Sequence, residues 1–415
     1  SGCYWDLAPY FRNKVTFANQ AKVEEKLREL VEDTVRLRLV SDVPLGAFLS
    51  GGVDSSAVVA LMSELSPGRV KTFSIGFDES DFSEIKHARR VANRFSTDHH
   101  EFVVRPDAME VLPMLVRHYG EPYADSSAIP TYYLSKMTRQ HVTVALNGDG
   151  GDECFAGYER YAAMRISEQY HRLPRSLREN LLDPLLATLP EPGITRSRLG
   201  KVRRFLSVMD RPRTERYLRW ASAISEDLKF ALCTPEFLHR AGSSASVEYL
   251  RPWFAGNGSL DIVDRALKAD TESYLPNDLL VKVDIASMAA SVEARSPFLD
   301  HRLMEFAAKL PASYKMRGVK TKYLLKQALR GLLPAENLTR GKMGFGVPIG
   351  HWLRDELKGL LQETVLSQKA ESRGYFRPNV VRNMVEQHQS GKRDYAHQLW
   401  TLLMLELWHR EFMDG

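Results

Sequence analysis

The stretch LGAFLSGGVDSSAVVALMSEL, residues 45–65, decides the fold. Its first part, LGAFLS at 45–50, is a short apolar run of the kind that forms a buried strand. SGGVDSS at 50–56 predicts a turn, because it is rich in glycine and serine. SSAVVALMSEL at 55–65 predicts a helix opened by serines, which are good helix caps. The stretch therefore predicts a strand, a glycine-rich turn and a helix.

The alternation of strand and helix continues on both sides of this unit. Before it, apolar residues at helical spacing predict an amphipathic helix over residues 21–39. After it, we expect a strand at 70–77, a helix at 83–95, a strand at 100–104 and a second strand-turn-helix unit at 142–161. Strands that alternate with helices form parallel sheets covered on both faces. We therefore predict an α/β fold with a parallel sheet flanked by helices.

The rest of the chain reads as helical. Residues 162–260 lose the strand-helix rhythm and predict a helical insertion, and further helices are expected in DLLVKVDIASMAA (278–290) and HRLMEFAAKLP (301–311). The expected organisation is a connector at 1–20 followed by one domain at 21–415. Within that domain we expect a core at 21–161, the insertion at 162–260 and a C-terminal helical part at 261–415.

Composition limits the class of protein. The chain has 415 residues, of which 44% are hydrophobic and 26% charged, as in ordinary soluble globular proteins. No apolar stretch is long enough for a transmembrane helix. Cys3, Cys154 and Cys233 lie far apart in the sequence and form no CxxC pair, which is typical of a reducing compartment. We therefore expect a cytoplasmic protein that does not act at a membrane.

The net charge of +5 is local. Residues 196–219 contain nine Lys or Arg and two Asp or Glu, so this stretch alone carries +7. Such a block can bind nucleic acid, but a solvated helical surface is the simpler interpretation, and we expect no nucleic-acid partner.

The glycine-serine turn has the chemistry of a phosphate site. Glycines let the backbone approach an anion, the N–H groups and serine hydroxyls donate to it, and the N-terminus of the following helix favours negative charge. GxxxxGK[ST] is absent, so this is not the P-loop of γ-phosphate-transferring enzymes. A plain strand-helix connection is the structural alternative.

Asp54 lies in this turn, and a carboxylate beside phosphates requires a cation. Mg²⁺ is the natural one, because it commonly takes one or two carboxylates plus substrate phosphates. A second acidic loop, NGDGGDE at 147–153, follows another predicted strand. Because parallel strand ends meet at one sheet edge, Asp54 and Asp152 are the predicted metal ligands. An acidic glycine turn or a Ca²⁺ loop is the alternative for NGDGGDE.

Five motifs stand in order along the chain: SGGVDSS (50–56), SIGFDE (74–79), NGDGGDECFAGYERY (147–161), SVEARSPFLDHRL (291–303) and RGKMGFGVPIGHWL (340–353). Together they resemble the synthetase domain of glutamine-hydrolysing asparagine synthetases. The resemblance implies an ATP pyrophosphatase (PP-loop) fold of the adenine-nucleotide α-hydrolase type. It implies that a carboxylate attacks the α-phosphorus of ATP, that pyrophosphate leaves, and that ammonia converts the acyl-adenylate into an amide.

The resemblance also assigns roles to residues. Leu49 and Ile75 would contact the nucleotide base and ribose, and Asn147 and Gly148 would line the same pocket. The departing pyrophosphate would be held by Ser50, Gly51, Gly52, Asp54, Ser55 and Ser56. Lys342, in a glycine-rich loop, would reach toward the reacting carboxyl and the α-phosphate.

Two further acids are candidate catalytic residues. Asp149 would lie near the adenylate intermediate, and a structural turn aspartate is the alternative. Glu293 could accept a proton from the incoming amine. A purely structural ion pair with Arg295 is the alternative for Glu293.

The implied substrates are ATP, ammonia, and aspartate or another carboxylate. Residues 1–20 look like a connector from a glutaminase domain, so we expect this chain to use free ammonia; a homodimer is left open. β-Lactam synthetases place a tyrosine where Asp149 stands, which disfavours lactam formation by their route. The sequence also leaves open a macrolactam-forming enzyme, a nucleotide-binding pseudoenzyme and an RNA-modifying PP-loop protein.

Overall fold

The computed structural model describes residues 2–79, 82–104, 108–178, 205–242, 245–255, 260–341, 344 and 346–414. The chain divides into two compact units. The first comprises Ser1–Pro106, Ser127–Ala162 and Ser259–Val347. The second comprises Asp107–Ser126, Ala163–Gly258 and Pro348–Gly415.

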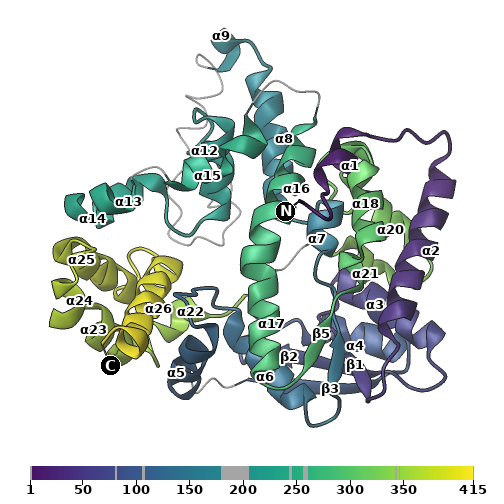
Figure 1. Cartoon of the computed structure of the whole chain (residues 1–415), viewed down its shortest axis with the longest axis horizontal. Helices are drawn as coiled ribbons and strands as arrows, with labels where there is room; N and C mark the ends of the chain where they lie inside the picture. Colours follow the sequence, from purple (N-terminus) through teal and green to yellow (C-terminus); the bar gives the residue numbers. More distant parts are fainter. Residues whose placement is uncertain are drawn as a thin grey trace. The chain divides into compact units, whose positions relative to one another are not determined.

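A five-stranded sheet forms the centre of the first unit (Figure 1). Its strands are β1 (Leu45–Phe48), β2 (Lys71–Gly76), β3 (Asp98–Val103), β4 (Val144–Leu146) and β5 (Glu293–Arg295). They lie in the order β3-β2-β1-β4-β5, and every neighbouring pair is parallel. Ala47 at the centre of the sheet lies opposite both Thr72 and Leu146.

The strand order reverses at β1. The chain passes from β1 to β2 and β3 on one side, whereas β4 and β5 lie on the other side of β1. The loops that follow β1 and β4 therefore leave the same edge of the sheet in different directions. Open parallel sheets bind ligands at such a point, outside the carboxyl ends of the strands.

Helices flank the sheet: α3 packs on β1, α4 and α6 pack on β2, and α17 packs on β5. The helices of this unit are α1 (Ala8–Arg12), α2 (Gln20–Arg38), α3 (Val53–Leu65), α4 (Ile85–Arg94), α6 (Ala128–Thr138), α7 (Gly151–Phe155), α16 (Ile262–Ala269), α17 (Leu280–Met288), α18 (His301–Lys309), α19 (Ala312–Lys315), α20 (Tyr323–Ala328) and α21 (Ala335–Thr339), with a π-helix η3 (Asp270–Leu279) and a 3-10 helix η4 (Pro297–Leu299). The predicted α/β class with a parallel sheet flanked by helices is confirmed.

Two local predictions differ from the structure. No strand is expected at VEAR (292–295), which lies between the helices predicted at 278–290 and 301–311, but this segment contains the three-residue strand β5. α3 begins at Val53 with Gly52 as its N-cap, so the helix starts two residues before the serines expected to open it. Every residue from Val53 to Met62 is buried, because α3 packs against α2, α4 and α21 as well as the sheet. The buried start of α3 fixes the position of Asp54.

The segment before α2 is packed against the first unit. Lys14 donates to the carbonyl oxygens of Ala308 and Leu310 at 2.7 and 3.1 Å, and its ammonium lies 2.9 Å from Asp264. Burial, and then the nearby charge of Lys315, lowers the pKa of Lys14 to about 8. The connector expected at 1–20 therefore contains, at Lys14, a point of attachment to α16 and α18.

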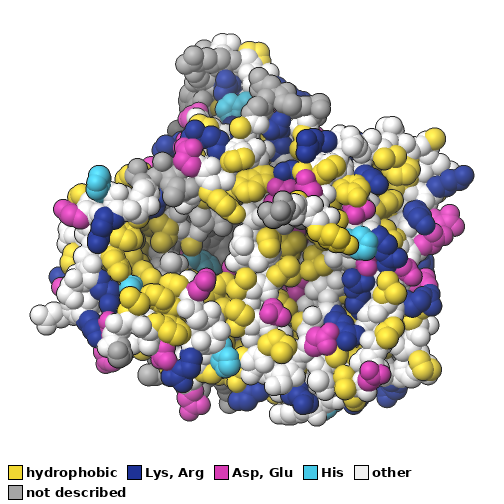
Figure 2. Space-filling view, viewed as in Figure 1, with side chains coloured by type: hydrophobic (Ala, Val, Ile, Leu, Met, Phe, Trp, Pro, Cys, Tyr) yellow, Lys and Arg dark blue, Asp and Glu magenta, His cyan; other side chains and the backbone are white. Residues whose placement is uncertain are grey.

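Surface charges of both signs are interspersed on the face drawn in Figure 2. On α2, Lys26 lies 3.3 Å from Glu29 and Arg36 lies 2.5 Å from Glu32. Exposed pairs of this kind contribute only a few tenths of a kcal/mol. No helix in the described part of the chain has the length and apolar character needed to cross a membrane.

The second unit is helical in its described residues. It contains α5 (Ala108–Tyr119), α9 (Arg175–Leu177), α12 (Arg213–Ala221), α13 (Glu226–Leu232), α14 (Pro235–Ala241), α15 (Ala245–Phe254), α22 (Ile349–Trp352), α23 (Lys358–Val365), α24 (Gln368–Ser372), α25 (Pro378–Gln389) and α26 (Ala396–Phe412), while α8 (Glu159–His171) begins in the first unit. In the basic stretch, residues 196–204 lie outside the described residues. Arg213 and Arg216 both form ion pairs with Glu168, at 2.5 and 2.8 Å. Part of the positive charge of the basic stretch is therefore compensated within the second unit.

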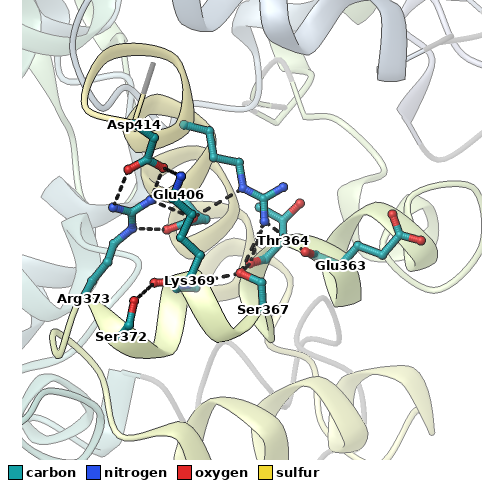
Figure 3. Close-up of polar contacts among 10 residues, drawn as sticks. Glu363, Thr364, Ser367, Lys369, Ser372, Arg373, Glu406 and Asp414 are labelled. Atoms are coloured by element: carbon teal, nitrogen blue, oxygen red, sulfur yellow. Dashed lines mark hydrogen bonds and ion pairs between the residues drawn. The ribbon is translucent and has the colours of Figure 1, made fainter.

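An ion-pair cluster joins α24 to α26 (Figure 3). Arg373 lies 2.6 Å from both Glu406 and Asp414, and Lys369 also reaches Asp414 at 3.1 Å. The hydrogen bonds from Arg373, followed by one from Lys369, hold the pKa of Asp414 down to about 2. Arg410 lies 3.4 Å from Glu406 as well. The buried Glu406 is thus neutralised by two guanidinium groups.

Replacing Arg373 by methionine is expected to lower the free energy of unfolding of this helical unit by about 2 kcal/mol, because it leaves the buried Glu406 with one partner. Urea unfolding followed by circular dichroism measures the loss. Arg382→Met is the matched control, since Arg382 forms a largely exposed pair with Glu371. That change should cost under about 0.5 kcal/mol. Equal losses in the two variants would contradict the prediction.

Candidate active site

The turn after β1 gathers hydrogen-bond donors at the carboxyl end of the sheet. Gly51 has a φ of +73°, and a Cβ there would lie 2.4 Å from the carbonyl carbon of His87, so only glycine fits. The hydroxyls of Ser50 and Ser55 lie 3.0 Å apart, and the N–H of Gly52 donates to Ser50 Oγ at 3.3 Å. These groups lie at the N-terminus of α3, which favours an anion. The turn therefore has the donors of a phosphate cradle.

The acidic loop after β4 lies directly against this turn. A Cβ on Gly148 would lie 2.7 Å from the backbone nitrogen of Ser55. A Cβ on Gly151 would lie 2.5 Å from the carboxyl carbon of Asp54. Any larger residue would push the two loops apart, so the glycines of NGDGGDE are needed for this close approach. Two motifs that are about 100 residues apart in the sequence thus meet at the switch point.

Lys322 bridges the two predicted metal ligands. Its ammonium lies 2.6 Å from Asp152 Oδ1 and also contacts Asp54 Oδ2. The side chains of Asp54, Asp152 and Lys322 are only 12, 9 and 5% exposed. Burying carboxylates costs several kcal/mol per ion unless a cation compensates them. Lys322 supplies that compensating charge and brings a third functional group to the site.

Lys322 belongs to none of the motifs that the sequence singled out. It precedes α20 in the left-handed backbone region, with a φ of 53°, and its N–H donates to Phe155 O at 3.1 Å. A Cβ on Gly157 would lie 2.3 Å from Lys322 Cε and 1.7 Å from Asp152 Oδ1, so Gly157 makes room for both groups. The surrounding GVKTKYLL sequence (318–325) has no spacing typical of a phosphate site. Only the packed fold reveals this lysine.

The carboxylates fit a metal that shares its ligands with substrate. Among the described residues, no group of three or more His, Cys, Asp or Glu side chains could hold a metal ion. Mg²⁺ does not need such a cage, because it often takes one or two carboxylates and completes its shell with phosphate oxygens and water. Asp54 and Asp152 already face one common cation, the Lys322 ammonium, beside the phosphate-type turn. The donor set therefore fits Mg²⁺ bound together with a phosphate ligand.

A second buried carboxylate follows Asp152. Glu153 accepts a hydrogen bond from the Tyr158 hydroxyl at 2.5 Å. Burial, and then the charge of Asp152, raises the pKa of Glu153 to about 7. The Arg160 guanidinium lies over the Tyr158 ring at 4.0 Å and pairs with Asp270 at 2.7 Å. This layer of tyrosine and arginine supports the end of the acidic loop.

Asn147 shapes the turn that carries Asp149. Its Oδ1 accepts a hydrogen bond from the N–H of Asp149 at 3.2 Å and another from Ser296 Oγ at 2.6 Å. Asp149 itself is half-buried, between β4 and α7. Its position in the loop that meets the phosphate-type turn agrees with a place near the reacting groups, and its role remains a prediction.

Leu49 and Ile75, the residues predicted to contact the base and ribose, are both buried. Their exposed fractions are 2 and 6%. Leu49 follows β1 and donates its N–H to Phe73 O at 2.8 Å, while Ile75 packs in the apolar cluster with Phe73. Both residues lie at or near the strand ends, where the prediction places the nucleotide.

Glu293 is not brought to this group. It begins β5 and lies in register with Val144 at the amino end of β4, whereas the site loops follow the carboxyl ends of their strands. Its side chain is 55% exposed and lies 2.6 Å from Arg295, whose hydrogen bond lowers the pKa of Glu293. The structure thus places Glu293 in the ion pair that we gave as the structural alternative. Lys342 lies outside the described residues.

The parallel sheet, the glycine-serine turn at the switch point and the paired carboxylates are the features of an α/β domain of the PP-loop type. More particularly, the chain belongs to the asparagine synthase family, which it matches over residues 26–410.

Several known proteins resemble this chain. It is 34% identical over 392 residues to asparagine synthetase (glutamine-hydrolyzing) 1 of Bacillus subtilis, covering 94% of this chain and 59% of that protein. It is 35% identical over 402 residues to a putative asparagine synthetase (glutamine-hydrolyzing) of Mycobacterium bovis, covering 95% and 59%. A more distant relative is amidase chyE of Penicillium rubens, 25% identical over 421 residues, covering 92% and 61%. The chain thus spans about 59% of the two synthetases' length.

Proposed function

We propose that this chain uses ATP to activate a carboxylate and then converts it to an amide, with aspartate as the acid and asparagine as the product. The observation that carries the proposal is the convergence of Asp54, Asp152 and Lys322 beside the serine-glycine turn. Two relatives of this chain are named asparagine synthetases, which supports asparagine as the product. A carboxylate oxygen of the acid would attack the α-phosphorus, and the bond from that phosphorus to pyrophosphate would break.

The site residues divide this work. Negative charge grows on the leaving pyrophosphate, so the donors should concentrate there. The hydroxyls of Ser50 and Ser55 and the N–H of Gly52 would donate to its oxygens. Asp54 and Asp152 would hold Mg²⁺, which when bound offsets the charge on pyrophosphate. Lys322 lies at the same carboxylates and would donate to the same phosphates.

The second half-reaction adds nitrogen. Ammonia would attack the acyl carbon, AMP would leave with the bonding electrons, and the nitrogen would lose a proton to give the amide. Asp149 would act near the adenylate, and Lys342 would reach the reacting carboxyl from its glycine-rich loop. We propose free ammonia as the donor for this chain and a glutaminase domain as the source of that ammonia.

Isotope exchange between ATP and pyrophosphate tests this function directly. We expect exchange with aspartate and Mg²⁺ at least about tenfold above the rate without acid, followed by AMP and asparagine once ammonia is added. Glutamine in place of ammonia should give no asparagine. Exchange with another acid only would assign the amide ligase a different substrate. No exchange with any acid would contradict the proposed function and favour a nucleotide-binding pseudoenzyme.

A further inference from the structure

The carbonyl group of Gly51 is held from outside its turn. Asn337 lies in α21 with no exposed surface, and its Nδ2 donates to Gly51 O at 2.8 Å and to His87 O at 3.3 Å. Both partners are carbonyl oxygens, so the amide group that faces them must be the NH₂ group. A single side chain therefore ties the phosphate-type turn to α4.

This contact fixes the direction of the next peptide N–H. In a trans peptide the C=O and the N–H point in opposite directions, and no described peptide bond is cis. Because the Gly51 carbonyl faces Asn337, the Gly52 N–H faces away from it, toward Ser50 Oγ at 3.3 Å. Asn337 thus presents the N–H side of this peptide to the cradle formed by the two serine hydroxyls.

The Gly51–Gly52 peptide needs a hydrogen bond from outside the turn to keep its orientation. Glycine adopts positive and negative φ about equally easily, so the Gly51–Gly52 peptide can reverse at little cost. A reversed peptide would turn its carbonyl oxygen toward the cradle, where it would repel a phosphate. The same segment of chain also holds the preceding residue, because Arg340 reaches Ser50 O at 3.5 Å and contacts the nearly buried Glu84. The turn is therefore fastened at two successive carbonyl groups.

We propose that Asn337 is a positioning residue for pyrophosphate, which keeps the Gly52 N–H directed at the leaving group. It touches neither substrate nor reacting atoms in this role. The inference rests on the proposed function, because it assigns the serine-glycine cradle to pyrophosphate. It goes beyond that function in predicting that Asn337, a residue outside the motifs, controls the affinity for pyrophosphate.

Asn337→Leu removes the amide and keeps most of the volume, and Asn337→Ala is the second variant if the first does not fold. We expect either change to weaken binding of inorganic pyrophosphate about tenfold, measured by calorimetry with Mg²⁺ and no acid substrate. The KM for ATP should rise by a similar factor, because the same phosphates occupy the cradle. The KM for aspartate should stay within about twofold, because no aspartate contact is removed.

Thr34→Val is the matched control. Thr34 is equally buried, and its hydroxyl donates only within α2, to Val31 O at 2.8 Å. It should lower thermal stability without changing pyrophosphate binding. Unchanged pyrophosphate affinity in the Asn337 variants would overturn the positioning role and leave the proposed function intact. An equal rise in the KM for aspartate would also overturn it, as a general loss of structure. If the unmodified chain binds no pyrophosphate, the proposed function itself fails.

Discussion

Asp54→Asn is expected to lower ATP–pyrophosphate exchange at least about a thousandfold, at every Mg²⁺ concentration. A factor of a thousand corresponds to about 4 kcal/mol of lost transition-state stabilisation. The amide keeps the shape of the side chain, but it is neutral and a poor Mg²⁺ ligand. In the proposed mechanism the metal held by Asp54 and Asp152 would offset the charge on the leaving pyrophosphate, and the variant would lose that compensation. Exchange of labelled pyrophosphate into ATP, with aspartate present, measures the effect.

Asp33→Asn is the control for the change in charge. Asp33 pairs with Arg302 at 2.7 Å on the half-exposed surface of α2, and it belongs to neither of the loops that form the site. Its exchange rate should stay within about twofold of the unmodified rate. Asp54→Glu should lower exchange as strongly as Asp54→Asn. The Asp54 carboxyl packs so closely on Gly151 that a Cβ there would lie 2.5 Å from it, which leaves no room for a longer side chain. More than a tenth of normal exchange in Asp54→Asn would refute the metal assignment.

The meeting of Asp54 and Asp152 can be predicted from sequence for a simple reason. Each follows a short apolar strand, and parallel strands end at one edge of a sheet. The alternation of strand and helix, with its glycine turns, therefore indicates the neighbourhood of both residues without any knowledge of packing. The positive charge of Lys322, which lies between the two aspartates, cannot be predicted in this way. Lys322 comes from a segment 170 residues after Asp152, and its N–H donates to Phe155 O, a contact that forms only in the packed fold.

Glu293 illustrates a different limit of reasoning from sequence. β5 has the sequence EAR, with two charged residues among its three, so it lacks the apolar run that marks β4, and VEAR is interpreted as a link between helices. Without the strand there is no register, and without the register nothing tells which end of the sheet Glu293 occupies. The pairing of Glu293 with Val144 decides this, and it places the residue at the amino end. The end of a strand can predict a site residue only when the sequence pattern predicts the strand itself.

Lys322→Met is expected to lower exchange about as strongly as Asp54→Asn, and to destabilise the chain in a way that Mg²⁺ reverses. The methionine removes the cation between two nearly buried carboxylates, which then repel each other. Added Mg²⁺ should therefore raise the melting temperature of the variant by several degrees more than that of the unmodified chain. Lys322→Arg should not restore exchange, because the larger guanidinium does not fit. Gly157 packs so closely on the Lys322 side chain that a Cβ there would lie 2.3 Å from Lys322 Cε.

Measuring stability and exchange on the same samples separates two roles of this lysine. If Lys322 only neutralises the carboxylates, Mg²⁺ that restores the melting temperature should also restore exchange to within about tenfold. If Lys322 also donates to the phosphates, Mg²⁺ should restore the melting temperature alone, which is the result we expect. Lys320→Met, at an exposed lysine two residues earlier, should change neither quantity. If exchange by the Lys322→Met variant recovers with Mg²⁺, Lys322 only compensates the charge of the two aspartates. The phosphates would then be bound by the turn after β1 and by Mg²⁺ on Asp54 and Asp152, without Lys322.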